Sequence, residues 1–108
     1  MKKLELKLDL ESLNLAKEDK ETSVQKIIGN VIENVILGFG QQMRGFDEKE
    51  RRQYYKIADA MDDAVKNNKT EVELEDDQMG FLRKCFRETK LMPNKLLRQI
   101  EELILKNE

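Results

Sequence analysis

The side chains that could do chemistry in this sequence are carboxylates, lysines and arginines, because histidine is missing and cysteine occurs once. Histidine is the commonest general base and, together with cysteine, the usual zinc ligand. A single cysteine also excludes a disulfide within one chain. The composition therefore argues against most familiar catalysis. We expect a protein that is not an enzyme and that needs no cofactor.

Two dense groups of carboxylates are the candidates for a cation site. One consists of Asp59, Asp62 and Asp63, and the other of Asp76 and Asp77. Mg²⁺ and Ca²⁺ prefer such oxygen ligands, but neither group has the glycine-bearing spacing of a calcium loop. We therefore interpret both groups as helix caps and solvent-facing charges. A metal-dependent hydrolase or nuclease is the least favoured function, and neither a metal ligand nor a small-molecule substrate is predicted.

A basic group near the C-terminus could contact phosphates. Its members are Arg83, Arg87, Lys90, Lys95 and Arg98. On a helix, residues three and four positions apart share a face, and such a face could neutralise about two or three phosphates. Acidic residues at the start of a helix and basic residues at its end also complement the helix dipole. Nucleic-acid binding is therefore the alternative function and not the leading one.

The same region could contain a helix-turn-helix. In that arrangement Asn94, Lys95, Arg98 and Gln99 would face the bases. Consecutive helices are common in other folds, and no glycine marks a tight turn before Pro93. We keep this motif only as a minor form of the nucleic-acid alternative.

The clearest apolar pattern is the candidate for a protein-binding surface. The segment Val24–Phe39 carries apolar residues at steps of three and four, which is the period of an amphipathic helix. This stripe is longer than we expect a domain of 108 residues to need. It predicts a surface shared with a protein partner or a second copy, although an ordinary core helix gives the same pattern. The predicted partner-binding residues are Ile28, Ile32, Val35, Ile36 and Phe39.

Two segments alternate with the period of a half-buried strand. Leu4–Leu10 places leucines on one face and charged residues on the other, and Thr70–Leu74 repeats the pattern over a shorter length. A pair of strands is marginal alone, so the two must pack against helices or another chain. Their relative direction does not follow from the pattern.

Capping signals predict where the first two helices begin and end. Thr22 and Gln25 match a capping box before the apolar stripe. Gly38 or Gly40 can take the left-handed conformation that ends this helix. A second helix is expected from Asp47, which forms another box with Glu50, to about residue 66.

Two further helices are expected near the C-terminus. The third begins at the acidic residues 75–77, and the fourth begins at Pro93, because proline is favoured at the first helical position. Cys85 follows the apolar pattern of the third helix and is predicted to be a packed thiol. The elements predict one α+β domain over residues 1–108, mostly α, in the order β-α-α-β-α-α. A helical bundle with extended arms is the alternative fold.

The charge balance and hydropathy limit where the protein acts. Charged residues make up 39% of the chain, yet the formal net charge is only -2, so no overall field attracts nucleic acid or an anionic membrane. No apolar run approaches a membrane span, and the N-terminal segment lacks the apolar core of a signal peptide. We expect a cytoplasmic protein that binds no membrane.

The segments MKKLELKLDL, IIGNVIENVILG and EVELEDDQMGFLRK, followed by a helix after Pro93–Asn94, resemble small phage- or prophage-encoded proteins of unknown function. This resemblance implies expression in the cytoplasm of a bacterial host and carries over no site residue. The leading hypothesis is a non-enzymatic accessory protein that binds a protein partner or forms a homo-oligomer. The alternative is a nucleic-acid-associated regulator that uses the basic face of the two C-terminal helices.

Overall fold

The protein has four helices and a small sheet. The computed structural model describes residues 2–9, 11–13 and 23–106. Its elements are β1 (Lys2–Glu5), α1 (Val24–Gln42), α2 (Glu48–Lys66), β2 (Glu71–Leu74), α3 (Asp76–Glu88) and α4 (Lys95–Leu105). The predicted α+β class and the order β-α-α-β-α-α are confirmed.

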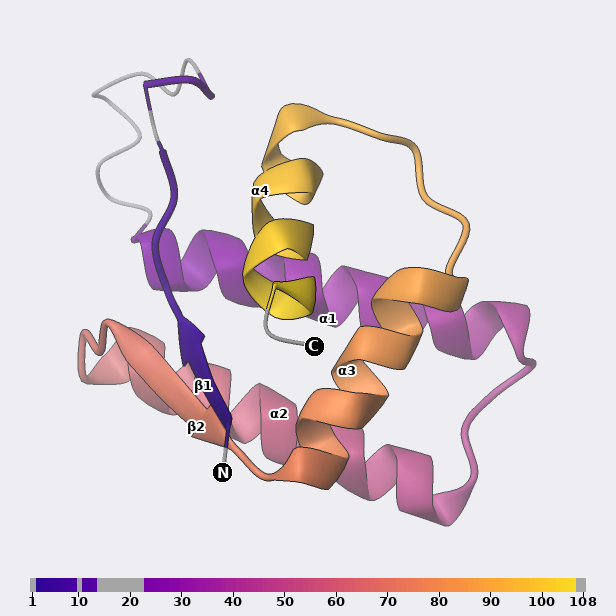
Figure 1. The fold of residues 1–108 in the computed structure, drawn as a ribbon. Coiled ribbons are helices and arrows are strands. Elements are labelled where there is room, and N and C mark those ends of the chain that lie inside the picture. Colours follow the sequence, from indigo (N-terminus) through magenta and orange to yellow (C-terminus); the bar gives the residue numbers. More distant parts are fainter. Residues whose placement is uncertain (1, 10, 14–22, 107–108) are drawn as a thin grey trace.

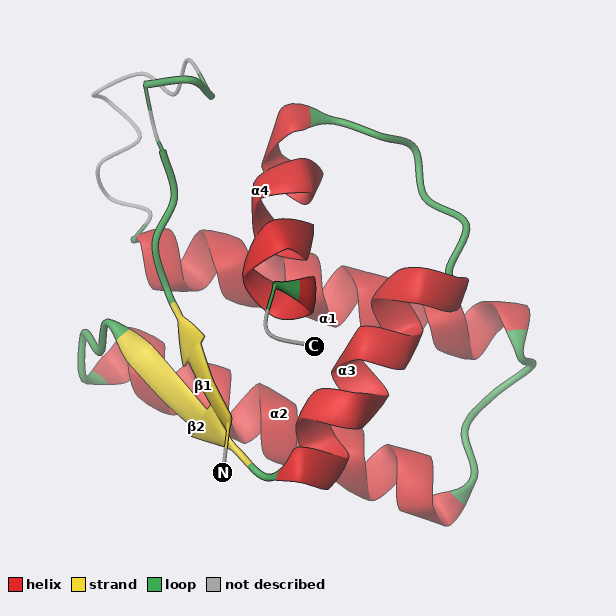
Figure 2. Ribbon diagram, viewed as in Figure 1, coloured by secondary structure: helices red, strands yellow, loops and turns green. Residues whose placement is uncertain are grey.

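The helices α1 and α2 lie side by side and run in opposite directions, as Figure 1 shows. The sheet, α3 and α4 pack on one side of this pair (Figure 2). β2 contacts α2, whereas α3 contacts both α1 and α2. The α1–α2 pair is therefore the layer on which the other described elements rest.

The two strands pair antiparallel, with Leu4 opposite Val72 and both side chains buried. The Leu6 N–H continues the pairing by donating to the Thr70 carbonyl at 2.8 Å. β1 is shorter than the predicted strand Leu4–Leu10, whose last residue lies outside the described residues. The strand ends at Glu5 because Glu5 pairs with Glu71, the first residue of β2. Farther along, the Asp9 N–H donates to the Gln99 side chain of α4 at 2.8 Å.

The start of α2 confirms the predicted capping box. The Glu50 N–H donates to the Asp47 carboxylate at 2.8 Å, and the Asp47 N–H donates to the Glu50 carboxylate at 3.1 Å. These bonds satisfy two amides that have no partner within the helix. Because Asp47 and Glu50 lie within one helical turn, the sequence alone is enough to predict both hydrogen bonds.

The start of α1 differs from its prediction. Ser23 is the N-cap and accepts from the Lys26 N–H at 3.2 Å, whereas Thr22 lies outside the described residues. The Gln25 side chain is buried and donates to the Lys69 carbonyl at 2.7 Å, which ties the start of α1 to the turn between α2 and β2.

The predicted C-terminal end of α1 and the predicted first residue of α4 were also wrong. Gly38 and Gly40 lie inside α1, and the positive φ angles fall at Arg44 and Gly45. At the other end of the chain, α4 begins after Asn94 and not at Pro93. Asparagine is a strong N-cap residue, and the Asn94 side chain accepts from the Leu97 N–H at 2.7 Å.

The apolar stripe of α1 forms the centre of the core. This helix contacts α2, α3 and α4. Three phenylalanine rings close the core near the end of α1, with centroids 6.0–6.3 Å apart between Phe39, Phe46 and Phe81. The Phe46 ring lies directly against Gly40, where an added Cβ would come within 2.6 Å of the ring.

Two helical glycines therefore predict opposite effects of alanine. We expect Gly40→Ala to lower the free energy of unfolding by about 1–3 kcal/mol, because the Phe46 ring must leave its place among the other rings. Gly80→Ala meets nothing within 4 Å and should stabilise the protein by about 0.5–1 kcal/mol. Urea denaturation measures both, and equal shifts in one direction would contradict the close packing at Gly40.

Candidate functional site

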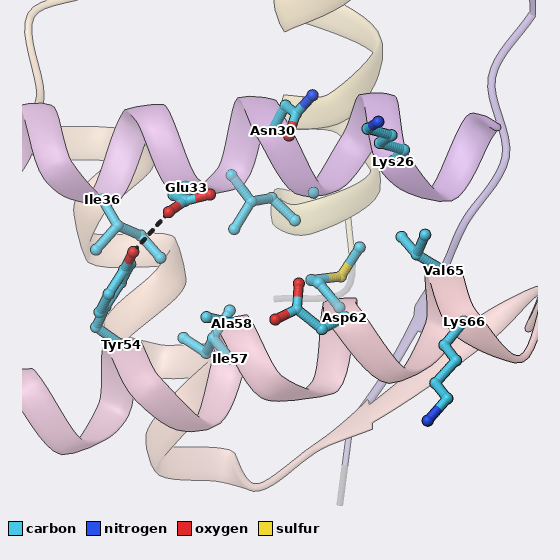
Figure 3. A pocket seen from close by; sticks show the side chains of 13 residues that line it. Lys26, Asn30, Glu33, Ile36, Tyr54, Ile57, Ala58, Asp62, Val65 and Lys66 are labelled. Atoms are coloured by element: carbon cyan, nitrogen blue, oxygen red, sulfur yellow. Dashed lines mark hydrogen bonds between the residues drawn. The ribbon is translucent and has the colours of Figure 1, made fainter. Parts of the chain in front are cut away.

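A groove of about 280 Å³ lies between α1 and α2. Residues of these two helices alone line it (Figure 3). Its floor consists of Ile32, Ile36, Ile57 and Met61, which are buried and also belong to the core. Its lining includes two small residues, Ala58 on α2 and Gly29 on α1, where a Cβ would meet Met61 at 3.6 Å. We call this feature the α1–α2 groove.

The rim of the α1–α2 groove is charged and polar. Lys26 lies near the start of α1 and Lys66 near the end of α2, so both mark the same end of the antiparallel pair. Asp62 lies one turn before Lys66 on α2, whereas Glu33 lies about two turns after Lys26 on α1 and beside Tyr54, as Figure 3 shows. The groove thus combines an apolar floor with charges of both signs at separate positions.

One hydrogen bond crosses the α1–α2 groove. The Tyr54 hydroxyl donates to the Glu33 carboxylate at 2.8 Å. Partial burial and this bond, together with the charges of Glu33 and Asp62, raise the pKa of Tyr54 to about 12. The phenol therefore remains protonated at neutral pH and acts as a donor that holds Glu33 in place.

The structure places the five predicted partner-binding residues inside the core. Ile28, Ile32, Val35, Ile36 and Phe39 are all at most 3% exposed. The stripe faces inward because α2, α3 and α4 all pack against α1, so Ile28, Val35 and Phe39 are closed to another chain in this conformation. Only Ile32 and Ile36 line the groove, as its floor.

The sequence interpretation missed the residues that form the accessible part of the groove. These are Gly29, Tyr54, Ala58 and Val65, the last of which is 38% exposed. One signal was present: a glycine inside a helix costs about 0.5–1 kcal/mol relative to alanine, and Gly29 interrupts the apolar stripe. Its meaning depends on α2, which no local pattern places opposite it.

The predicted nucleic-acid residues separate into different environments. Arg87, Lys95 and Arg98 line one hollow between the end of α3 and the start of α4, together with Glu101. Arg83 lies elsewhere, because its Nε donates to the Ile104 carbonyl at 3.0 Å. Lys90 is exposed in the connection between the helices and is not part of the hollow.

The structure differs from the predicted helix-turn-helix in the length of the connection and in the roles of two side chains. The connection from Thr89 to Asn94 is longer than the tight turn of that motif. Asn94 caps its own helix. The Gln99 side chain bonds to the Asp9 backbone and to the Ser12 hydroxyl. Two of the side chains predicted to face bases are therefore occupied within the fold.

Asp63 and Cys85 have surroundings that suit a structural role and not a chemical one. Within residues 2–9, 11–13 and 23–106, no group of three or more acidic or thiol side chains is placed to hold a metal ion. Asp63 accepts from Lys69 and Asn67, and the hydrogen bond from Lys69 is the main cause that lowers the pKa of Asp63. Burial, followed by the charge of Glu50, raises the pKa of the Cys85 thiol to about 12, so this packed thiol is a poor nucleophile.

None of the described helices is both long enough and apolar enough to cross a bilayer. Comparison with protein-family models, with curated proteins and with solved structures found no match for this chain. The α1–α2 groove and the basic hollow are therefore judged on their own chemistry.

The Tyr54–Glu33 bond can be tested by alkaline titration. In Tyr55→Phe, Tyr54 is the sole tyrosine, and its absorbance change should have a midpoint near pH 12. Because the folded chain keeps this proton above the ordinary value of 10.0, its contribution to stability is complete below pH 10 and is lost as the pH rises through 12. Adding Glu33→Gln should lower the midpoint. A midpoint near 10 in a chain that circular dichroism shows to be folded would contradict the bond.

Proposed function

We propose that this chain is a non-enzymatic accessory protein, encoded by a phage or prophage, that acts in the bacterial cytoplasm by binding a protein partner or a second copy of itself. The α1–α2 groove is the observation that carries this proposal. The resemblance of the sequence segments to small phage proteins supports the phage origin. The proposal moves the contact surface from the inner stripe of α1 to the outer side of the α1–α2 pair.

The lining of the groove favours protein side chains as its ligands. The groove holds about 280 Å³, which has room for one or two large side chains. An apolar centre with a polar rim and an aromatic residue is also the common composition of a protein interface, and Tyr54 supplies the aromatic residue here.

A photo-reactive amino acid in the groove tests this function. We expect the reactive residue at Val65, on the groove rim, to form a discrete adduct in the bacterium that carries the gene. Gly29→Leu should abolish the adduct, because a Cβ at Gly29 meets Met61 at an ordinary 3.6 Å and the longer side chain then fills the groove.

Two matched controls accompany this experiment. Gly80→Leu introduces the same side chain at an open helical position and should leave the adduct intact. The reactive residue at Tyr55, which is 57% exposed but does not line the groove, should not form the adduct. Light scattering identifies a second copy as the partner by a mass above 12.7 kDa. A monomer without a groove-dependent adduct would refute the proposal.

A second candidate function is regulation through nucleic-acid binding at the basic hollow. The convergence of Arg87, Lys95 and Arg98 supports it, whereas Glu101 in the same hollow and the pairing of Arg98 with Glu102 at 3.4 Å oppose it. If this function is correct, a gel shift at low salt should be lost steeply as salt increases. Lys95→Gln with Arg98→Gln should also remove it. The absence of any shift at low salt would exclude this candidate.

A further inference from the structure

One side of the small sheet is not covered by any described strand. The order of the sheet is β1-β2, and Figure 1 shows β1 on one side of β2 and no other strand on the opposite side. The Leu6 N–H donates to the Thr70 carbonyl, and the pairing continues in register along β2. Because the backbone groups of a strand point alternately to its two sides, Val72 also bonds to β1, whereas the N–H and C=O groups of Glu71 and Glu73 point away from β1. We call this side of the sheet the β2 edge.

The backbone groups of the β2 edge are available to another chain. Within residues 2–9, 11–13 and 23–106, no hydrogen bond is made by the N–H or C=O of Glu71 or Glu73. An open hollow of about 700 Å³ borders the edge, and Ala60 and Asp63 of α2 form part of its lining. Asp63 is already paired with Lys69. An extended segment lying in this hollow would pair with the outward N–H and C=O groups, as a further antiparallel strand does.

The charges at the sheet determine which kind of segment suits the β2 edge. The face of the sheet away from the core carries Lys3, Glu5, Glu71 and Glu73, so acids outnumber bases there. Glu5 has Lys7 at 3.2 Å, and Glu71 has Lys3 at 3.8 Å. Glu73 makes no ion pair with any residue that the structure describes. The β2 edge therefore presents one shared and one unpaired negative charge, and both are exposed.

These charges disfavour a second copy of the chain at the β2 edge. Two such edges would place glutamate opposite glutamate, because both outward-pointing residues of β2 are acidic, and like charges at opposite positions destabilise a sheet. The free side of β1 fits no better. Its alternate residues are Lys3, Glu5 and Lys7, so two successive glutamates cannot both meet a lysine. A segment with bases at two alternate positions satisfies both Glu71 and Glu73.

We propose that the β2 edge binds an extended segment of a protein partner that carries lysine or arginine at two alternate positions. The segment adds a third strand to the sheet, a mode of recognition in which main-chain hydrogen bonds supply affinity and alternate side chains supply specificity. The two bases lie opposite Glu71 and Glu73. The residue between them lies beside Val72, on the side of the hollow that Ala60 lines, where an apolar side chain fits. The hollow and the α1–α2 groove have no lining residue in common, so this inference does not rest on the proposed function.

Short peptides with blocked ends test this inference without knowledge of the partner. The lysine peptide is threonine-lysine-valine-lysine-threonine, and the glutamate peptide has glutamate in place of both lysines. At concentrations of up to about 5 mM, where weak association is measurable, the lysine peptide should shift the amide NMR signals of Glu71 and Glu73 in a saturable way. The signals of Val72 and Leu74, whose N–H groups face β1, should shift less. The glutamate peptide should bind about two- to twentyfold more weakly, the range for two exposed charge pairs.

N-methylated peptides separate strand pairing from simple charge attraction. In the paired segment the N–H groups of both lysines point to the β2 edge, whereas the valine N–H points away from it. N-methylation of both lysines should therefore abolish the shifts. N-methylation of the valine is the matched control and should leave the affinity within about twofold of the unmodified peptide.

Protein variants connect the charge preference to named residues. The double variant Glu71→Gln with Glu73→Gln should bind the lysine and glutamate peptides within about twofold of each other. The control Glu101→Gln with Glu102→Gln changes the net charge equally at α4, away from the hollow, and should keep the preference for the lysine peptide. Circular dichroism establishes that each variant is folded before it is compared.

Several outcomes would overturn the inference. Equal binding of the lysine and glutamate peptides would exclude a basic partner, and unchanged binding after N-methylation of the lysines would exclude strand pairing. The absence of any saturable shift would exclude the site. If dilution of the protein alone shifts the Glu71 and Glu73 signals, a second copy occupies the edge and the inference is wrong. The Val65 adduct tests the proposed function separately, because the Glu71→Gln with Glu73→Gln variant should still form it.

Discussion

Burial of one face of α1 against three other helices holds this domain together. The side chains on that face are at most 3% exposed, and burying each large apolar side chain contributes about 1.5–3 kcal/mol relative to leaving it in water. α2, α3 and α4 all contact this helix, and Gln25 ties its start to the turn before β2. A change that turned α1 about its axis would disturb its contacts with α2, α3 and α4.

Because the apolar stripe of α1 faces the core, the candidate binding surface lies elsewhere on the molecule. The sheet, α3 and α4 pack on one side of the α1–α2 pair and leave its other side uncovered. Gly29 and Ala58 leave a hollow there, and Glu33, Tyr54 and Asp62 give it a defined chemistry. One face of α1 thus packs in the core, and the adjacent face lines the candidate site.

The sequence predicted one interaction within a helical turn but missed the equally local caps at Ser23 and Asn94, and interactions between distant segments could not be predicted from it. The Asp47–Glu50 box and the order of the elements followed from local patterns. Gly40 was misread as a cap because its role depends on the Phe46 ring, which lies across a turn. The long stripe was predicted to be a partner surface, whereas its burial in the structure depends on how many helices pack against it. The groove depends on Gly29 of α1 facing Met61 of α2, a relation that no local pattern contains.

Solvent accessibility measured in solution tests the division between the two faces of α1 most directly. A soluble paramagnetic agent broadens the NMR signals of groups that it can approach. The structure predicts strong broadening for the Val65 methyls and the Ala58 methyl on the groove, and protection for the methyls of Ile28 and Val35 in the core. Equal broadening of the core and groove methyls would show that the stripe of α1 is open to solvent, and it would return the candidate partner surface to the inner face.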